Sequence, residues 1–171
     1  QPQADSFLAL FQDPDNPSTP PDFTPLAPPA GATTPIDIVV TLDAGISINE
    51  GDLAIPNGIR VQINGGTWHA GSPALTLSSG DLVITGATFV NDTPAPTILV
   101  TGGHLTLRND IIEESTGSSQ AAIAILGGTV DLGTAADPGG NTFNVNGAGM
   151  FFLYTTANPI TAIGDTFERD G

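Results

Sequence analysis

Cysteine and lysine are both missing from this 171-residue chain, and cationic side chains of any kind are scarce. The absence of cysteine excludes a disulfide scaffold, a thiol nucleophile and cysteine-based metal or iron–sulfur sites. The chain has three arginines against 18 aspartates and glutamates in total, which gives a formal net charge of −15 at pH 7. Because nucleic-acid phosphates and anionic membrane surfaces repel such a chain, we expect no nucleic-acid partner.

Long hydrophobic runs are missing as well, since no stretch approaches the roughly 20 apolar residues that span a bilayer. We therefore expect no membrane insertion. The printed chain begins at Gln1 without a basic and apolar leader, which fits either a mature chain whose signal was removed or an excised fragment. The acidic, lysine-free composition favours a secreted protein that is extracellular or bound to the cell surface.

Hydrophobic residues still make up 39% of the chain, which is enough for one domain with a core. The 21 glycines and 15 prolines argue against a helical bundle. Nine of the 15 prolines lie within residues 1–35. Proline fixes φ and biases the residue before it toward extended conformations, so this segment is expected to form an extended, polyproline-II-like arm.

Short β-type runs separated by Gly, Asn, Asp and Pro fill residues 36–171. Apolar and polar residues alternate in residues 59–63, 81–85 and 104–108, a period that buries one face of a strand. The runs also repeat, three to a unit of roughly 20 to 30 residues, with the extra residues in turn-like stretches. This organisation is typical of a solenoid of β-coils.

Alignment of the repeats predicts three columns of stacked side chains. The first contains Ile59, Leu82, Leu105 and Val130, followed two residues later by Val61, Ile84, Leu107 and Leu132. The second contains Trp68, Phe89, Ile112, Phe143 and Phe167. The third opens at Leu75, Ile98, Ile123 and Phe151. We therefore expect an all-β fold, a right-handed parallel β-helix of about five to six coils over residues 36–171. A β-sandwich is the alternative, but it does not need columns at a near-constant period.

Residues 102–109, Gly-Gly-His-Leu-Thr-Leu-Arg-Asn, resemble the GGxLTLxN repeat of bacterial surface and autotransporter-like β-helix proteins. Residues 132–134 and 138–143 are similar to repeats in very long β-strand-repeat proteins of environmental bacteria. The resemblance covers about residues 36–171 and implies a stalk, an adhesin or a surface fibre. Its motifs are low in complexity, so they imply an architecture rather than an activity.

Polysaccharide lyases and polygalacturonase-like hydrolases share this fold, so an enzyme is one alternative. Such hydrolases place acidic pairs on adjacent coils and carry Asn-x-Asp, Asp-Asp, Gly-His-Gly and Arg-x-Lys motifs, none of which is present. A lyase needs Arg or Lys for its anionic substrate together with Ca²⁺-binding Asp, and here the arginines are dispersed. We expect a non-enzymatic protein with no cofactor and no metal site.

One polar patch is a candidate binding site. His104, Thr106 and Arg108 alternate with inward leucines and should point outward. The column alignment places Asp81 beside His104, and Asp131 beside Thr106 and diagonal to Arg108. The functional interpretation is a small polar binding patch or a remnant acid/base site. The alternative is ordinary charge pairing between coils, worth about a few tenths of a kcal/mol per pair.

Three further features have simpler interpretations. Glu113 and Glu114 are expected in a solvated acidic loop, and His69 is expected in a turn. Two lone histidines do not make a metal site. Asn91 begins a glycosylation sequon that the proline at position 94 disfavours.

The ends of the solenoid carry the functional hypothesis, because the end strands of a β-helix present unpaired backbone groups. We expect a secreted structural subunit that stacks end to end into a filament, residues 151–167 of one copy meeting residues 36–48 of the next. The arm would dock on its own domain or clamp that neighbour. The residues predicted for self-assembly are Phe7, Leu8, Leu10 and Phe11 in the arm and Phe151, Phe152 and Phe167 in the last coil.

The alternative function is a stalk segment of a surface adhesin or a carbohydrate-binding β-helix module. Such a module should show an exposed aromatic platform, and Tyr154 is the aromatic residue least committed to the interior. The expected partners are copies of the same chain, with glycans or a cell surface as the alternative.

Overall fold

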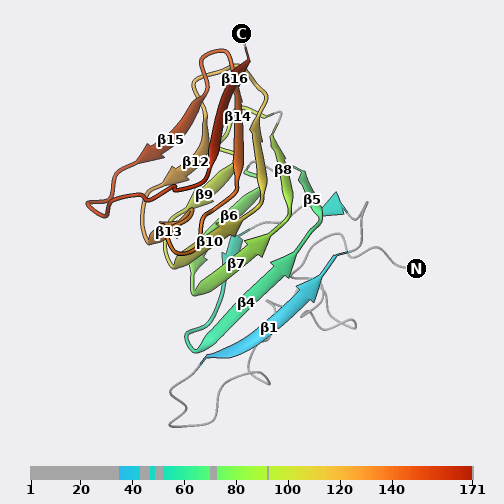
Figure 1. The fold of residues 1–171 in the computed structure, drawn as a ribbon, viewed down its shortest axis with the longest axis vertical. Coiled ribbons are helices and arrows are strands. Elements are labelled where there is room, and N and C mark those ends of the chain that lie inside the picture. Colours follow the sequence, from blue (N-terminus) through green and yellow to red (C-terminus); the bar gives the residue numbers. More distant parts are fainter. Residues whose placement is uncertain (1–34, 43–46, 49–51, 70–72, 92, 171) are drawn as a thin grey trace.

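The computed structural model describes residues 35–42, 47–48, 52–69, 73–91 and 93–170. These residues form sixteen β-strands in three parallel sheets, and none of the described segments is helical (Figure 1). Correspondingly, no helix able to cross a membrane is found in the described part of the chain. The protein is a parallel β-solenoid of about five coils, so the predicted fold class is confirmed.

Each of the first five coils contributes one strand to each sheet, in the chain order A, B, C, and β16 adds a sixth strand to sheet B. Sheet A contains β1 (Ile36–Thr41), β4 (Ile59–Asn64), β7 (Asp81–Thr85), β10 (His104–Arg108) and β13 (Thr129–Asp131). Sheet B contains β2 (Ser47–Ile48), β5 (Thr67–His69), β8 (Thr88–Asn91), β11 (Ile111–Glu114), β14 (Thr142–Asn146) and β16 (Thr166–Asp170). Sheet C contains β3 (Asp52–Ala54), β6 (Leu75–Ser79), β9 (Ile98–Val100), β12 (Ala121–Ile125) and β15 (Met150–Tyr154). Strand β1 lies at one end of the solenoid, and β15 and β16 lie at the other (Figure 1).

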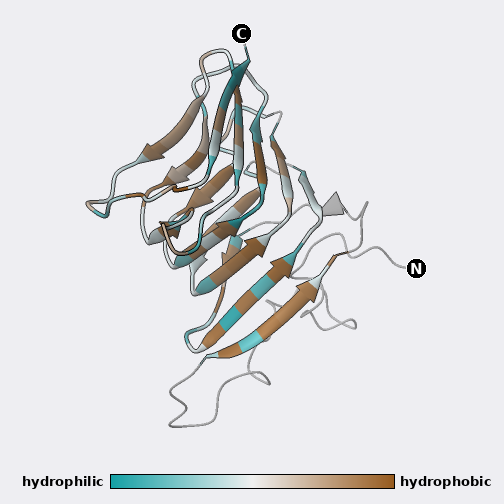
Figure 2. Ribbon diagram, in the orientation of Figure 1, coloured by the Kyte–Doolittle hydropathy of each residue, from teal (hydrophilic) through white to brown (hydrophobic). Residues whose placement is uncertain are grey.

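The second predicted column is confirmed residue by residue. Trp68 pairs with Phe89, Phe89 with Ile112, Ile112 with Phe143, and Phe143 with Phe167. The Trp68 and Phe89 rings stack with their centroids 5.4 Å apart. Its first four members are fully buried, and they form part of an interior of aliphatic and aromatic side chains that continues along the solenoid. In Figure 2 strand β4 alternates between hydrophobic and hydrophilic residues, as one buried and one solvated face require.

The first predicted column is wrong by two residues at its start. Leu82 pairs with Val61 rather than with Ile59, and Val61 pairs in turn with Ile38. From Leu82 onward the expected pairs with Leu105 and Val130 are present. A slip of two residues keeps the same face of a strand inward, so the hydrophobic pattern does not reveal it. Ile59 is buried as well, which shows why both alignments fit the sequence.

The third column is wrong by one residue at its last coil. Ile123 pairs with Phe152, and not with Phe151. Both phenylalanines are half-buried and pack against the core, so hydrophobicity alone does not distinguish them.

Glycine pairs form the corner between sheets C and A. A Cβ atom on Gly102 would lie 2.2 Å from the carbonyl oxygen of Ser78, and one on Gly127 would lie 2.2 Å from that of Thr101. The backbones of neighbouring coils therefore approach too closely here for any side chain. The double glycine of the repeat motif is explained by this close approach rather than by chemistry at a site.

Candidate functional site

The outer face of sheet A carries the predicted polar patch on β7, β10 and β13. His104 pairs in register with Asp81 on one side and Thr129 on the other, and Thr106 pairs with Asp131. The predicted neighbours are therefore side by side, as expected from the column alignment. The same outer column begins with Asp37 and Arg60, so acidic and basic residues alternate along it from coil to coil.

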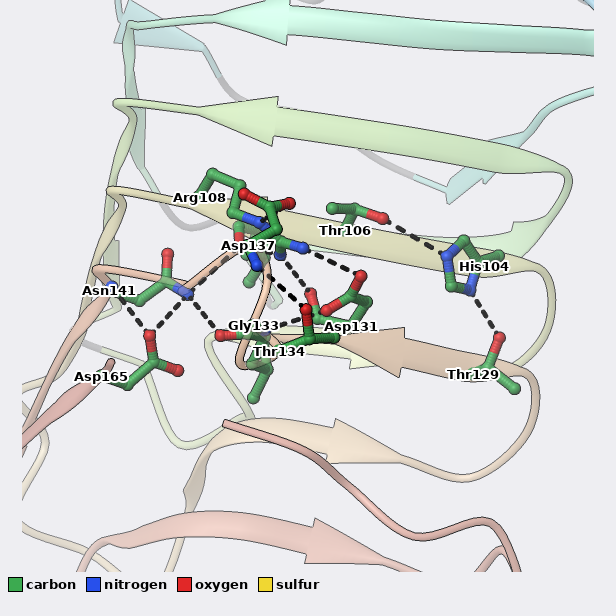
Figure 3. Close-up of polar contacts among 12 residues, drawn as sticks. His104, Thr106, Arg108, Thr129, Asp131, Gly133, Thr134, Asp137, Asn141 and Asp165 are labelled. Carbon is green, nitrogen blue, oxygen red and sulfur yellow. Dashed lines mark hydrogen bonds and ion pairs between the residues drawn. The ribbon is translucent and has the colours of Figure 1, made fainter. Parts of the chain in front are cut away.

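Arg108 is the most heavily engaged residue of the patch (Figure 3). Its guanidinium donates to the carboxylates of Asp131 and Asp137, each at 2.9 Å, and also to the backbone carbonyls of Leu107 and Asp131. Only 11% of the side chain is exposed. Burial disfavours ionisation of Arg108 and Asp131, but the hydrogen bonds between them raise the pKa of Arg108 and lower the pKa of Asp131.

His104 is held by two threonines. Its Nδ1 lies 2.7 Å from the hydroxyl of Thr129, and its Nε2 lies 3.3 Å from the hydroxyl of Thr106 (Figure 3). Both ring nitrogens are thus occupied by neighbouring side chains. The arrangement connects β10 to β13 and leaves the imidazole no free nitrogen for a substrate.

The other two arginines also connect neighbouring coils. Arg60 donates to both carboxylate oxygens of Asp37, at 2.8 and 3.1 Å, and this hydrogen bond lowers the pKa of Asp37. Arg169 donates to the backbone carbonyls of Gly147 and Gly149 and lies over the ring of Phe151, 5.4 Å from its centroid. All three arginines of the chain therefore bind groups of an adjacent coil.

A ladder of carboxyl and amide side chains joins the coils at the corner between sheets A and B. Oδ1 of Asp110 accepts from the backbone N–H of Ala87 at 2.7 Å, and Oδ1 of Asn141 accepts from the N–H of Asp110 at 3.0 Å. Oδ1 of Asp165 accepts from the N–H of Asn141 at 2.9 Å (Figure 3). Each side chain thus satisfies a backbone donor on the preceding coil.

Two acids of this ladder have unusual proton affinities. Burial raises the pKa of Asp110 to about 8, against the opposing effect of hydrogen bonds from the backbone N–H groups of Ala87 and Arg108. Burial also raises the pKa of Asp165, while hydrogen bonds from Asn141 oppose it. Sequence reasoning missed this ladder. The available signal was an Asp or Asn standing two residues before the aromatic or aliphatic member of the second column.

Two simpler predictions, those for Glu114 and His69, are corrected by burial and backbone position, whereas the burial of Asn91 agrees with a disfavoured sequon. Glu114 is fully buried rather than solvated, with Oε1 accepting from the N–H of Thr116 at 3.2 Å and Oε2 left without a partner. Asn91 is also fully buried, and its amide donates to the carbonyl of Ala95. A buried amide is not accessible to a glycosyltransferase. His69 belongs to strand β5 and not to a turn.

The predicted assembly residues fall into two groups. Phe7, Leu8, Leu10 and Phe11 lie outside the described residues. Phe151, Phe152 and Phe167 come together at the C-terminal end, where Phe167 makes edge-on contacts with the other two rings, at 5.2 and 5.7 Å between centroids. The ring of Phe167 also stacks on Phe143 at 5.2 Å and 10°. It remains 42% exposed, because the coil it belongs to is the last one described.

No metal centre is found in the described segments, which bring together no group of three or more Asp, Glu or His that could hold an ion. No family model, no curated protein and no solved structure matches this chain. The geometry of the solenoid itself is therefore the basis for a functional proposal.

Proposed function

We propose that this protein is a non-enzymatic structural subunit of an extracellular fibre or surface filament, built by end-to-end stacking of β-solenoids. The observation that carries the proposal is the end of the aromatic column at Phe167. Its ring stacks on Phe143 and is 42% exposed, so the interior stack stops without a covering layer among the described residues. A further coil placed there would bury this ring as Phe143 is buried.

The opposite end supports the same proposal. Strand β1 pairs with β4 on one side, and no other described strand lies beyond it in sheet A. Ile38 and Val40 are half-buried there and belong to the columns that become fully buried at Val61 and Ile63 in the next coil. Each end thus leaves members of the interior columns less buried than their partners in the adjacent coil, in sheet B at Phe167 and in sheet A at Ile38 and Val40. Contact between unlike ends does not close on itself, so it propagates as a filament.

The engagement of the polar side chains supports a non-enzymatic role. The His104 ring and the Arg108 guanidinium, which a catalytic or anion-binding site would need, bind groups of this chain that connect neighbouring coils. An adhesin stalk or carbohydrate-binding module is the alternative function. It is favoured by one observation, the 53% exposure of Tyr154.

The test compares two residues of equal exposure. Phe167 and Ile111 are both 42% exposed, but Phe167 lies at the end of the interior column, whereas Ile111 lies on the outer side of sheet B. We expect Phe167→Asp to abolish filaments in negative-stain electron microscopy and in concentration-dependent light scattering. Ile111→Asp should leave them in place, because a lateral charge does not enter an end-on junction.

Circular dichroism and melting curves of both variants show whether the solenoid is intact. Strict monomers of the unchanged protein over the whole concentration range would contradict the proposal and favour the stalk or binding module. A glycan array would then be the next measurement, with Tyr154→Ala as the variant that removes the exposed ring.

A further inference from the structure

Three asparagines of the chain are followed directly by glycine, at residues 57–58, 64–65 and 146–147. An asparagine in this dipeptide can lose its side-chain amide without an enzyme, by attack of the next backbone nitrogen on its own side chain. Glycine favours the attack because it has no side chain to hinder it and adopts backbone conformations closed to other residues. The three sites contain the same reacting groups, so a difference between them must come from the fold.

The site at residues 64–65 is held by the coils on both sides. Asn64 is the half-buried last residue of β4. Its side-chain amide donates to the hydroxyl of Thr41 in β1 at 3.4 Å. The backbone N–H of Gly65, which would have to attack, donates to the carbonyl of Thr85 in β7 at 2.8 Å. Both reacting groups are therefore bound to neighbouring coils.

The site at residues 146–147 has the same arrangement. Asn146 is the half-buried last residue of β14, and its side-chain amide donates to the carbonyl of Ser115 at 3.3 Å. The backbone N–H of Gly147 donates to the carbonyl of Asp170 in β16 at 2.9 Å. Here too, the amide is bound to the preceding coil and the attacking nitrogen to the following one.

The site at residues 57–58 differs from the other two. Asn57 and Gly58 lie outside the strands, in the turn that joins β3 to β4, and both are exposed. The turn is closed by one hydrogen bond, from the N–H of Ile59 to the carbonyl of Pro56, and its 3.3 Å is longer than usual. Among the described residues, no group accepts from the N–H of Gly58 and none binds the amide of Asn57.

We propose that Asn57 is a site of spontaneous deamidation in the folded protein, whereas Asn64 and Asn146 are protected. The backbone nitrogen of Gly58 attacks Cγ of Asn57 and forms a new N–C bond. The amide nitrogen of Asn57 leaves as ammonia and takes up the proton that the nitrogen of Gly58 gives up. The product is a five-membered succinimide ring.

Water completes the modification. It adds to one of the two carbonyl carbons of the succinimide and breaks the bond from that carbon to nitrogen. One direction gives aspartate, and the other gives isoaspartate, in which the main chain runs through the former side chain. Either product replaces a neutral amide by a carboxylate, so the chain gains one negative charge. The inference does not depend on the proposed assembly.

The hydrogen bonds explain why the fold selects one site of three. At Gly65 and Gly147 the bond to the adjacent coil must open before the nitrogen can attack, so the rate falls with the fraction of open molecules. At Gly58 the turn can rearrange at the surface without opening a sheet. We expect Asn57 to react at least tenfold faster than the other two, a ratio that corresponds to about 1.4 kcal/mol of opening free energy.

The sequence provides a direct assay. Because the chain has three arginines and no lysine, trypsin divides it into peptides 1–60, 61–108 and 109–169, each with one of the three sites. The full-length protein is incubated at mildly alkaline pH, which favours loss of the proton from the attacking nitrogen, and is then digested. Mass spectrometry with fragmentation measures the conversion of each amide to a carboxyl group and assigns it to a residue.

The same incubation in concentrated urea is the matched comparison. In the unfolded chain we expect the three sites to convert at comparable rates, because the bonds to the neighbouring coils are gone. The variant Asn57→Gln is the second control. It keeps the amide, but its ring closure would need six members and is slower, so the signal of peptide 1–60 at this position should disappear.

Two results would overturn the inference. One is conversion of Asn57 in the folded protein no faster than that of Asn64 and Asn146. The other is a preference for Asn57 that persists unchanged in urea, since it would then come from the neighbouring sequence rather than from the fold. Fast conversion of Asn57 in the folded protein together with equal rates in urea would establish it.

Discussion

The carboxyl group of Asp110 accepts a hydrogen bond from the backbone N–H of Ala87, 2.7 Å away on the preceding coil. The side chain of Asn141 occupies the same position one coil later. The corner can therefore be joined either by a buried acid or by a neutral amide. The two choices differ in how the stability of the fold depends on pH.

Asp110→Asn should remove a pH dependence of stability. Burial raises the pKa of Asp110 from 3.8 to about 8, so the folded protein holds this proton more tightly than the unfolded chain. Below about pH 4 both states are protonated. Between about pH 4 and pH 8, unfolding releases the proton, and stability falls as pH rises. In the unchanged protein this release of a proton gives the free energy of unfolding a slope of up to about 1.4 kcal/mol per pH unit in this window. We expect the slope to be absent in Asp110→Asn.

Urea titrations at several pH values between 5 and 8 measure this slope. In Asp110→Asn the side-chain NH₂ group replaces the oxygen that accepts from the backbone N–H of Arg108, so this hydrogen bond is lost. The loss lowers stability by the same amount at every pH and does not affect the slope. The converse variant, Asn141→Asp, buries a further carboxyl in the ladder and should steepen the slope. An unchanged slope in Asp110→Asn would show that this carboxyl is ionised in the fold at neutral pH.

Arg108→Gln should destabilise the solenoid by about 1–3 kcal/mol, because it leaves Asp131 without its charged donor and frees two backbone carbonyls. Arg60→Gln is the matched comparison and should cost clearly less, since Arg60 and Asp37 are 41% and 49% exposed and their attraction is screened by water. Chemical denaturation at pH 7 gives both values. Equal losses in the two variants would contradict the structural role assigned to Arg108.

Gly102→Ala should destabilise the fold by about 3 kcal/mol, since the new Cβ would lie 2.2 Å from the carbonyl oxygen of Ser78 and two coils would have to move apart. Gly86→Ala is the control. It has a φ of +69° but nothing within 4 Å of the added atom, so its cost is limited to about 1–2 kcal/mol of backbone strain. Thermal melts of the two variants compare the cost of the steric contact in Gly102→Ala with the cost of backbone strain in Gly86→Ala. A smaller loss in Gly102→Ala than in Gly86→Ala would contradict close packing of the coils at this corner.

The repeat pattern predicted the solenoid because the same physical constraint acts in every coil. A single coil cannot bury its own apolar face, so equivalent positions must stay apolar, and that periodicity is visible in the residues themselves. The column from Trp68 to Phe167 was predicted correctly because large aromatic residues mark their positions in most repeats. The pair formed by Arg108 and Asp131 followed directly from the same alignment.

Register and burial at particular positions needed the tertiary structure. Val61 rather than Ile59 pairs with Leu82, and Phe152 rather than Phe151 pairs with Ile123, since turn length decides between two hydrophobic residues that fit equally well. Glu114 looks like a surface acid in the sequence, yet its side chain is fully buried. Polarity alone therefore did not locate these side chains.

The sequence by itself determined the fold class, the alternation of buried and solvated faces and the scarcity of cationic groups, because composition and period are properties of the chain. Only the tertiary structure decided that all three arginines connect neighbouring coils, and that Asp110, Asn141 and Asp165 form one ladder. These features depend on contacts between residues more than 20 positions apart, and such contacts exist only once the coils have stacked in a particular register.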